Sequence, residues 1–308
     1  MNVVQFMHPG REIDVTGNAV GWNTGEHRRR LLYNPGEYID ANNNSYHHDS
    51  LCFWNEYEAP TRAYPTQLHQ GWNYARYYHQ IINPIPPFQI VQCNRLDNDN
   101  GECCVNTDPC VFGETFTYSN CQQVPGGDLW NLPPGSLILF GSLHAGDFYL
   151  DTVFVTRDRG IRYSVPIVGQ RLPFVASNNY MIVTLNNLQP RLNRRRQPNT
   201  TISEFMFYRG KLPQINGNGH VEGRDIFSFV PTRIFNTRDY NERCKIDLVA
   251  LNARLQHVQG FRMFSSGLTQ GHRTVVFNAA NANVTTIWRE VRDAVINAAF
   301  YLGYHFPW

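Results

Sequence analysis

Two apolar runs joined by a short glycine-containing connection constrain the fold of this chain more than any other pattern. Residues 136–141 read Ser-Leu-Ile-Leu-Phe-Gly, and residues 148–156 read Phe-Tyr-Leu-Asp-Thr-Val-Phe-Val-Thr. The runs are rich in apolar, β-branched and aromatic side chains, and a Leu-Pro-Pro-Gly turn at 132–135 precedes them. The pattern predicts a hairpin or an adjacent strand pair, and therefore a protein built on a sheet.

Further segments with the character of strands or helices lie on both sides of this pair. The many glycines among residues 1–60 predict short strands and loops there, and 94–124 and 189–201 are typical of polar loops. The last helix has the clearest pattern, because apolar residues recur at helical spacing from Trp288 to Leu302. The predicted strands are 88–93, 162–168, 180–185, 203–209, 226–230 and 273–277; the predicted helices are 64–82, 244–257 with Gly260 as its cap, and a last one from Thr285 or Thr286 to Gly303.

These elements predict an α+β fold, with a mixed, mostly antiparallel sheet and a few packing helices, the last of them C-terminal. The 308 residues suffice for one large or two ordinary domains. We expect a single domain over 1–308. The alternative is a division into an N-terminal segment 1–125 that bears the site and a segment 126–308 of sheet and helices, although no linker demands it.

Charge and cysteine content narrow the function classes. The net charge is +2, which excludes a strongly basic nucleic-acid coat, yet 25 of the 27 basic residues are Arg. Arginine suits phosphates and bases, although a GC-rich coding bias would produce the same excess. No run is of signal-peptide type or reaches the ~18 apolar residues of a spanning helix, so we expect a cytoplasmic protein with its seven cysteines reduced.

The N-terminal segment gathers residues suited to acid–base chemistry and phosphate binding. Glu56 and Glu58 are two apart, so in an extended segment they share a face with Trp54. When two carboxylates lie close together, one holds its proton more tightly than the other, so their pKa values differ. Such a pair is suited to acid–base catalysis. His27 and the run Arg28, Arg29 and Arg30 lie in the same segment. We expect His27, Glu56 and Glu58 to be catalytic, the arginines to hold phosphate and Trp54 to stack a base; the alternative is a solvated strand face.

A second candidate is the loop around Asp108. Asp108 precedes Pro109, which restricts its backbone, and it is our third candidate catalytic carboxylate. Asn120 and Gln122 can each donate and accept hydrogen bonds to a base edge, and Tyr118 can stack on it. An Asx turn between strands is the alternative.

The remaining candidates are basic and sulfur-containing. Arg194, Arg195 and Arg196 lie in a polar loop that could contact phosphates, or could simply be solvated. The cysteine spacing at 93, 103, 104, 110 and 121 fits no standard zinc site, so we expect buried free thiols, no metal and no cofactor. Asp151 lies inside an apolar strand, where it is either hydrogen-bonded for structure or functional.

Two stretches resemble known bacterial domains. The layout of Cys121-Gln122, the strand Pro134–Gly141 and the strand Asp151–Val155 resembles nucleotide-modification-associated domains and the strand pair of PUA-like folds of the ASCH and EVE kind. The N-terminal motifs from His8-Pro9-Gly10 to Glu58 are similar to those of uncharacterised proteins found near phage-defence genes. The resemblance implies recognition of modified bases in aromatic pockets and leaves the reaction open.

Taken together, the residues and the resemblance lead to one main hypothesis and two alternatives. The main one is a hydrolase acting on a nucleobase or an N-glycosidic bond in modified, phage-derived DNA, such as a base-excising DNA glycosylase in antiviral defence. The first alternative is a non-catalytic PUA-like reader of modified bases. The second is a structural subunit of a multi-protein defence system.

Overall fold

The computed structural model describes about two thirds of the chain, and every structural statement below concerns that part. The described residues are 1–8, 11–13, 19–21, 27–58, 109–112, 115–119, 127–144, 146–167, 169–176, 180–181, 184–185, 191–192, 201–223, 225–235, 242–258, 261–263, 271–276 and 282–306. The predicted helix 64–82 and the predicted strand 88–93 lie outside them.

A five-stranded sheet runs through the centre of the molecule in the order β14-β8-β7-β1-β15. The predicted apolar pair forms β7 (Leu137–His144) and β8 (Asp147–Val155), an antiparallel hairpin, so this prediction is confirmed. β1 (Asn2–Met7) pairs parallel with β7 and antiparallel with β15 (Gly271–Val276). β14 (Cys244–Ile246) borders β8. The chain therefore starts in an interior strand of this sheet.

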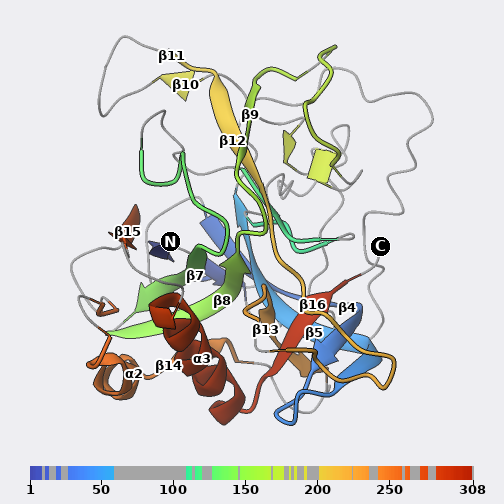
Figure 1. The fold of residues 1–308 in the computed structure, drawn as a ribbon, viewed down its shortest axis with the longest axis vertical. Helices are drawn as coiled ribbons and strands as arrows, with labels where there is room; N and C mark the ends of the chain where they lie inside the picture. The colour runs from blue at the N-terminus through green and yellow to red at the C-terminus, as the bar shows by residue number, and fades with distance from the viewer. Residues whose placement is uncertain are drawn as a thin grey trace.

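Both faces of the central sheet are covered by apolar side chains, which explains why β1, β7 and β8 are apolar at most positions. On one face, Leu137, Leu139 and Val153 pack with buried residues of two helices, α2 (Leu248–Leu255) and α3 (Ala282–Asn297). On the other face, Ile138, Phe140 and Phe154 join a second, aromatic-rich cluster. Figure 1 shows α2 and α3 at one end of the molecule, beside β7 and β8.

A second sheet follows the order β16-β13-β5-β4-β2-β3, and a further pairing of β16 with β4 closes four of its strands into a small barrel. The barrel strands are β4 (His27–Ile39), β5 (Ser45–Glu58), β13 (Val230–Ile234) and β16 (Tyr301–His305). β2 (Arg11–Ile13) and β3 (Ala19–Gly21) extend the sheet beyond β4. The hairpin of β4 and β5 is far longer than the short strands predicted for residues 1–60.

Phe306 packs against residues of this barrel. Its ring lies 4.5 Å from that of Phe53 and 6.3 Å from that of Phe112, measured between centroids. A Cβ added at Gly36 would lie 2.7 Å from Phe306 Cδ1, and one at Gly303 would lie 2.7 Å from Phe306 Cζ. Glycine inside two strands is therefore explained by the close approach of an aromatic ring, and it does not break the strands.

The rest of the described chain adds smaller sheets. β12 (Glu204–Arg209) pairs with β9 (Ile161–Ser164) and with β6 (Thr117–Tyr118), so strands form within the predicted ranges 162–168 and 203–209. β10 (Arg191–Leu192) pairs with β11 (Thr201–Ile202). Two of the pairings between described strands are parallel, β1 with β7 and β2 with β4, and the others are antiparallel. The fold is thus sheet-rich α+β.

Five predicted elements are wrong in extent or type. The strand predicted at 162–168 ends at Ser164. The last helix ends at Asn297 and not at Gly303, because Ala299 takes a positive φ of 61° and the chain then enters β16. The predicted helix 244–257 begins as strand β14, and α2 starts only after Asp247, whose side chain accepts from Ala250 N. The strand predicted at 226–230 lies at 230–234. In 180–185, the described part contains a helical turn in which Thr184 N donates to Tyr180 O.

The two halves considered at the sequence level share both larger sheets. β1 lies between β7 and β15, and β5 pairs with β13, so strands of 1–125 and 126–308 alternate in space. Among the described residues, no helix combines the length and apolar character needed to cross a membrane.

Candidate functional site at the charged end of the β4–β5 hairpin

The strand register brings the candidate acids and bases of the N-terminal segment together. In the antiparallel pair, Glu58 lies opposite His27, Glu56 opposite Arg29 and Trp54 opposite Leu31. Residues directly opposite each other share a face, with Cβ atoms about 4.5–5.5 Å apart. The prediction that Trp54, Glu56 and Glu58 share one face of an extended strand is therefore confirmed for the backbone, and His27 and Arg29 occupy the same face.

The third strand at this end divides the arginine run. β2 pairs in parallel with β4, so that Arg11 is the partner of Arg28 and Glu12 is the partner of Arg29. Because successive strand positions alternate between faces, Arg28 and Arg30 belong to the face opposite Arg29. One face thus carries Glu12, His27, Arg29, Glu56 and Glu58, and the other carries Arg11, Arg28, Arg30, Asn55 and Tyr57. Three consecutive arginines do not form one basic patch on a strand.

The first of these faces has the composition of an acid–base site. Its five positions hold three carboxylates, one imidazole and one guanidinium, on three neighbouring strands. A carboxylate beside a guanidinium keeps its charge, whereas carboxylates beside one another hold a proton more tightly. Such a set can supply a general base and a general acid together. These positions follow from the register of β2, β4 and β5.

Trp54 does not have the exposure that a base-stacking role needs. Its side chain is buried, in a small cluster with Cys52 and Phe235. The neighbouring Cys52 donates its S–H to the carbonyl oxygen of Arg233 at 3.2 Å. Burial raises the pKa of the Cys52 thiol to about 12, so this cysteine stays protonated and is no nucleophile at neutral pH. Trp54 and Cys52 therefore contribute to the packing of β5 and do not belong to the candidate site.

Tyr118 is also a core residue. It is fully buried, and its ring lies 5.2 Å from Phe140, 6.0 Å from Phe154 and 6.3 Å from Tyr208 between centroids. All these rings belong to the aromatic cluster on the face of the central sheet away from the helices. No face of the Tyr118 ring is open to a base in this structure, which contradicts the predicted stacking role.

Several candidates fall outside the described residues: Asp108, Asn120, Gln122, Arg194, Arg195 and Arg196. The same holds for Cys93, Cys103, Cys104 and Cys121. The cysteines that are described, Cys52, Cys110 and Cys244, are buried and free of disulfides. Among the described residues, no three His, Cys, Asp or Glu side chains gather closely enough to hold a metal ion.

Asp151 has a structural partner that the sequence did not reveal. Arg243 Nε lies 3.0 Å from Asp151 Oδ1, and Arg243 Nη2 lies 2.7 Å from Oδ2. Both side chains are buried, and Arg243 directly precedes β14, the neighbour of β8. A buried carboxylate needs such a charged, two-pronged partner. The structural interpretation of Asp151 is thereby favoured, although Arg243 stands 92 positions away and carries no local signal.

Comparison with known proteins adds no relative to this picture. No family model matches the chain, and neither a curated protein nor a solved structure matches it. The function is therefore inferred from the residues of this chain alone.

Proposed function

We propose that the chain is a hydrolase acting on a nucleobase or an N-glycosidic bond in DNA, with its chemistry at the charged end of the β4–β5 hairpin. The observation that carries the proposal is the register, which opposes Glu56 to Arg29 and Glu58 to His27 on one face. The resemblance to nucleotide-modification-associated domains supports the choice of substrate class, and modified phage DNA is the substrate that it suggests.

The residues on this face can divide the work of glycosidic hydrolysis. One carboxylate, Glu56 or Glu58, accepts a proton from water as the water oxygen bonds to C1′ of the sugar. The C1′–N bond breaks, its electron pair leaves with the base, and the base takes a proton from a protonated partner such as His27. The positive charge that develops on the sugar is stabilised by the second carboxylate, and Arg29 holds a neighbouring phosphate.

Two roles assigned from the sequence change within this proposal. Trp54 and Tyr118 are buried, so neither of them stacks on a base in the proposed mechanism. Arg28 and Arg30 belong to the strand face opposite Arg29, so phosphate binding beside the carboxylates falls to Arg29.

The test is product analysis on DNA. Purified protein is incubated with modified phage DNA and with unmodified DNA, and released bases and abasic sites are quantified by mass spectrometry. We expect Glu56→Gln or Glu58→Gln to slow base release by about 10²–10⁴-fold, the usual share of a general acid or base. Glu204→Gln is the matched control, because Glu204 is also a strand glutamate paired with an arginine, Arg162. Absence of product from every DNA would refute the hydrolase.

A reader of modified bases is the second candidate, favoured by the β7–β8 strand pair on which the PUA-like resemblance rests. A reader binds the same DNA saturably and in a salt-sensitive way, without turnover. Binding without product in the experiment above would therefore favour the reader over the hydrolase.

A further inference from the structure

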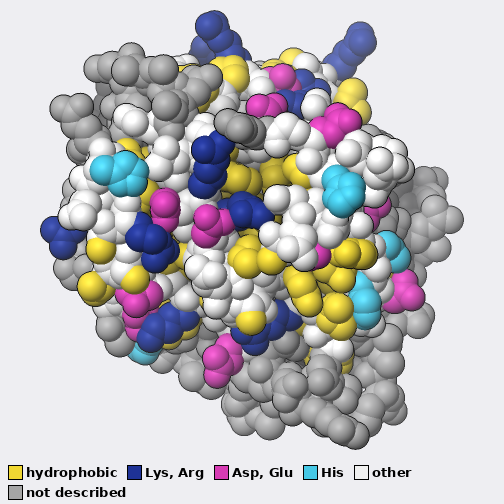
Figure 2. All heavy atoms as spheres, turned by 60° about the horizontal axis from the view of Figure 1, so that its bottom comes forward, with side chains coloured by type: hydrophobic (Ala, Val, Ile, Leu, Met, Phe, Trp, Pro, Cys, Tyr) yellow, Lys and Arg dark blue, Asp and Glu magenta, His cyan; other side chains and the backbone are white. Residues whose placement is uncertain are grey.

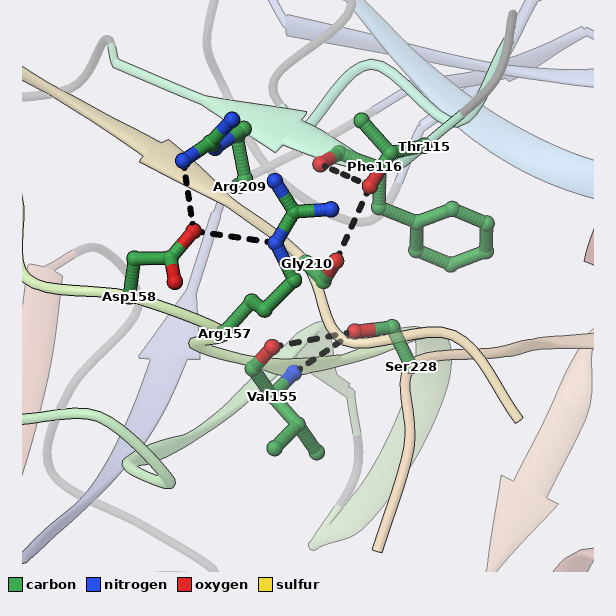
Figure 3. A network of polar contacts seen from close by, with 8 residues as sticks. All are labelled: Thr115, Phe116, Val155, Arg157, Asp158, Arg209, Gly210 and Ser228. Carbon is green, nitrogen blue, oxygen red and sulfur yellow. Dashed lines mark hydrogen bonds and ion pairs between the residues drawn. The ribbon is translucent and has the colours of Figure 1, made fainter. Parts of the chain in front are cut away.

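A group of polar contacts joins the end of β8 to the end of β12 (Figure 3). Arg157 and Asp158 follow β8, and Arg209 is the last residue of β12. The backbone N–H of Arg157 donates to Arg209 O at 2.8 Å. Ser228 Oγ bonds both backbone groups of Val155, at 2.9 and 3.3 Å. The backbone that carries the two arginines is thus held in place by hydrogen bonds on both strands.

Both guanidinium groups converge on a single carboxylate oxygen. Asp158 Oδ2 accepts from Arg157 Nε at 2.9 Å and lies 2.7 Å from Arg209 Nη2. The hydrogen bond from Arg157 is the main cause that lowers the pKa of Asp158, with the charge of Arg209 adding to it. Asp158 is therefore ionised at neutral pH, and the three side chains together carry a net charge of +1.

Among the described residues, the two arginines use few of their donors in ion pairs. A guanidinium has five N–H groups, and within the described part of the chain Asp158 is the only ion-pair partner of either arginine. The side chains are 43% and 38% exposed for Arg157 and Arg209. Figure 3 shows the two guanidinium groups side by side, with Arg157 turned toward Thr115. The carboxylate fixes their orientation, and the described ion pairs leave one positive charge unbalanced.

Other described arginines with acidic partners differ in this respect. Arg254 pairs with Glu290 at 2.7 Å, and Arg162 pairs with Glu204. Each of these pairs joins one arginine to one glutamate, so the pair has no net charge. On the face shown in Figure 2, basic and acidic side chains are interspersed and form no broad basic area. Exposed ion pairs contribute little to stability, so folding alone gives little reason to place two arginines on one aspartate.

We propose that Arg157 and Arg209, oriented by Asp158, form a binding site for a phosphate group. Planar guanidinium groups match the oxygens of phosphate through paired N–H donors, and an added anion balances the excess charge. The phosphate can belong to a DNA backbone or to a free phosphate compound. The exposed Arg159, two residues after Arg157, makes no ion pair within the described part and provides a further cation nearby. The site stands independently of the hydrolase proposed for the β4–β5 end.

The experiment uses two probes on the full chain. Binding of a fluorescein-labelled DNA oligonucleotide is followed by anisotropy over a salt series, and binding of inorganic phosphate is followed by ³¹P NMR. We expect Arg157→Gln or Arg209→Gln to weaken binding of at least one probe about tenfold, the value of one charge-assisted hydrogen bond. For DNA, the slope of log K against log salt should fall by about one per arginine removed.

Arg254→Gln is the matched control, because Arg254 has a similar exposure of 41% and a carboxylate partner at the same distance as that of Arg209. A loss with DNA alone identifies a backbone contact, and a loss with inorganic phosphate alone identifies a small phosphate ligand. If Arg157→Gln and Arg209→Gln bind both probes as Arg254→Gln does, the site is refuted. Base release from DNA is measured separately, so failure of the hydrolase leaves this result unaffected.

Discussion

Strands β4 and β5 pass through two regions of opposite character. From Glu37 to Ile39, β4 pairs with both β5 and β16 in the closed barrel, and Phe53 of β5 packs with Phe306. From His27 to Arg30, the same strand lies between β2 and the charged end of β5. The barrel region is held together by contacts between parts of the chain that are distant in sequence. The charged end is defined by residue types that alternate along β4 and β5. Stability should therefore depend on the barrel, and chemistry on the charged end.

The largest effect is expected from emptying the barrel. Phe53 is buried and contacts the rings of Phe306 and Phe112. Phe53→Ala should lower the free energy of unfolding by about 3–5 kcal/mol, because it removes buried area and leaves a cavity. Urea denaturation followed by tryptophan fluorescence measures this change. A loss below about 1 kcal/mol, typical of a surface position, would contradict the barrel as the stabilising region.

A smaller loss is expected from overfilling the same barrel. A Cβ at Gly303 would lie 2.7 Å from Phe306 Cζ and 3.0 Å from Thr232 Cγ2. Gly303→Ala should therefore cost about 1–3 kcal/mol by forcing the ring to move. Gly217→Ala is the control, since a Cβ there meets nothing within 4 Å. Equal stability of the two variants would show that Phe306 is not confined as described.

These glycines also explain what sequence reasoning could and could not predict. The β7–β8 hairpin was predicted correctly because its strands are apolar on both faces and a proline-glycine turn precedes them. The length of β4 was missed because Gly36 looks like a break, whereas it makes room for Phe306, which is 270 residues away. The end of α3 was missed because Leu302 continues the helical spacing although it lies in β16, opposite Ile39.

The sequence predicted which residue types form the candidate site, but it did not predict how they are distributed over the two faces of the strands. The alternation of Trp54, Glu56 and Glu58 follows from strand geometry alone and was confirmed. The separation of Arg28 and Arg30 from Arg29 follows from the same rule once the segment is known to be a strand. The burial of Trp54 and Tyr118 depends on Phe235 and Tyr208, which no local pattern connects to them.

Cys52 tests where the buried region of β5 ends. Burial raises its native pKa to about 12, above the value in the unfolded chain, so the native state holds the thiol proton longer. The stabilisation is complete below the unfolded pKa and is lost as the pH rises toward the native pKa. Above pH 9, the stability of the unaltered chain should fall more steeply than that of Cys52→Ala, by at most about 1.4 kcal/mol per pH unit. Urea titrations at pH 8, 9 and 10 measure both slopes, and parallel slopes would place Cys52 in contact with solvent.

The smallest effect on stability is expected at the charged end, where Glu56 and Glu58 lie opposite Arg29 and His27. Cross-strand pairs of opposite charge contribute about 0.2–1 kcal/mol, so Glu56→Gln or Glu58→Gln should change the free energy of unfolding by no more than that. The same variants should abolish most base release if the proposed chemistry is right. Urea denaturation and product analysis on one preparation separate the two readouts. A loss of several kcal/mol would instead make these glutamates part of the fold, and a lost activity would then report unfolding and not catalysis.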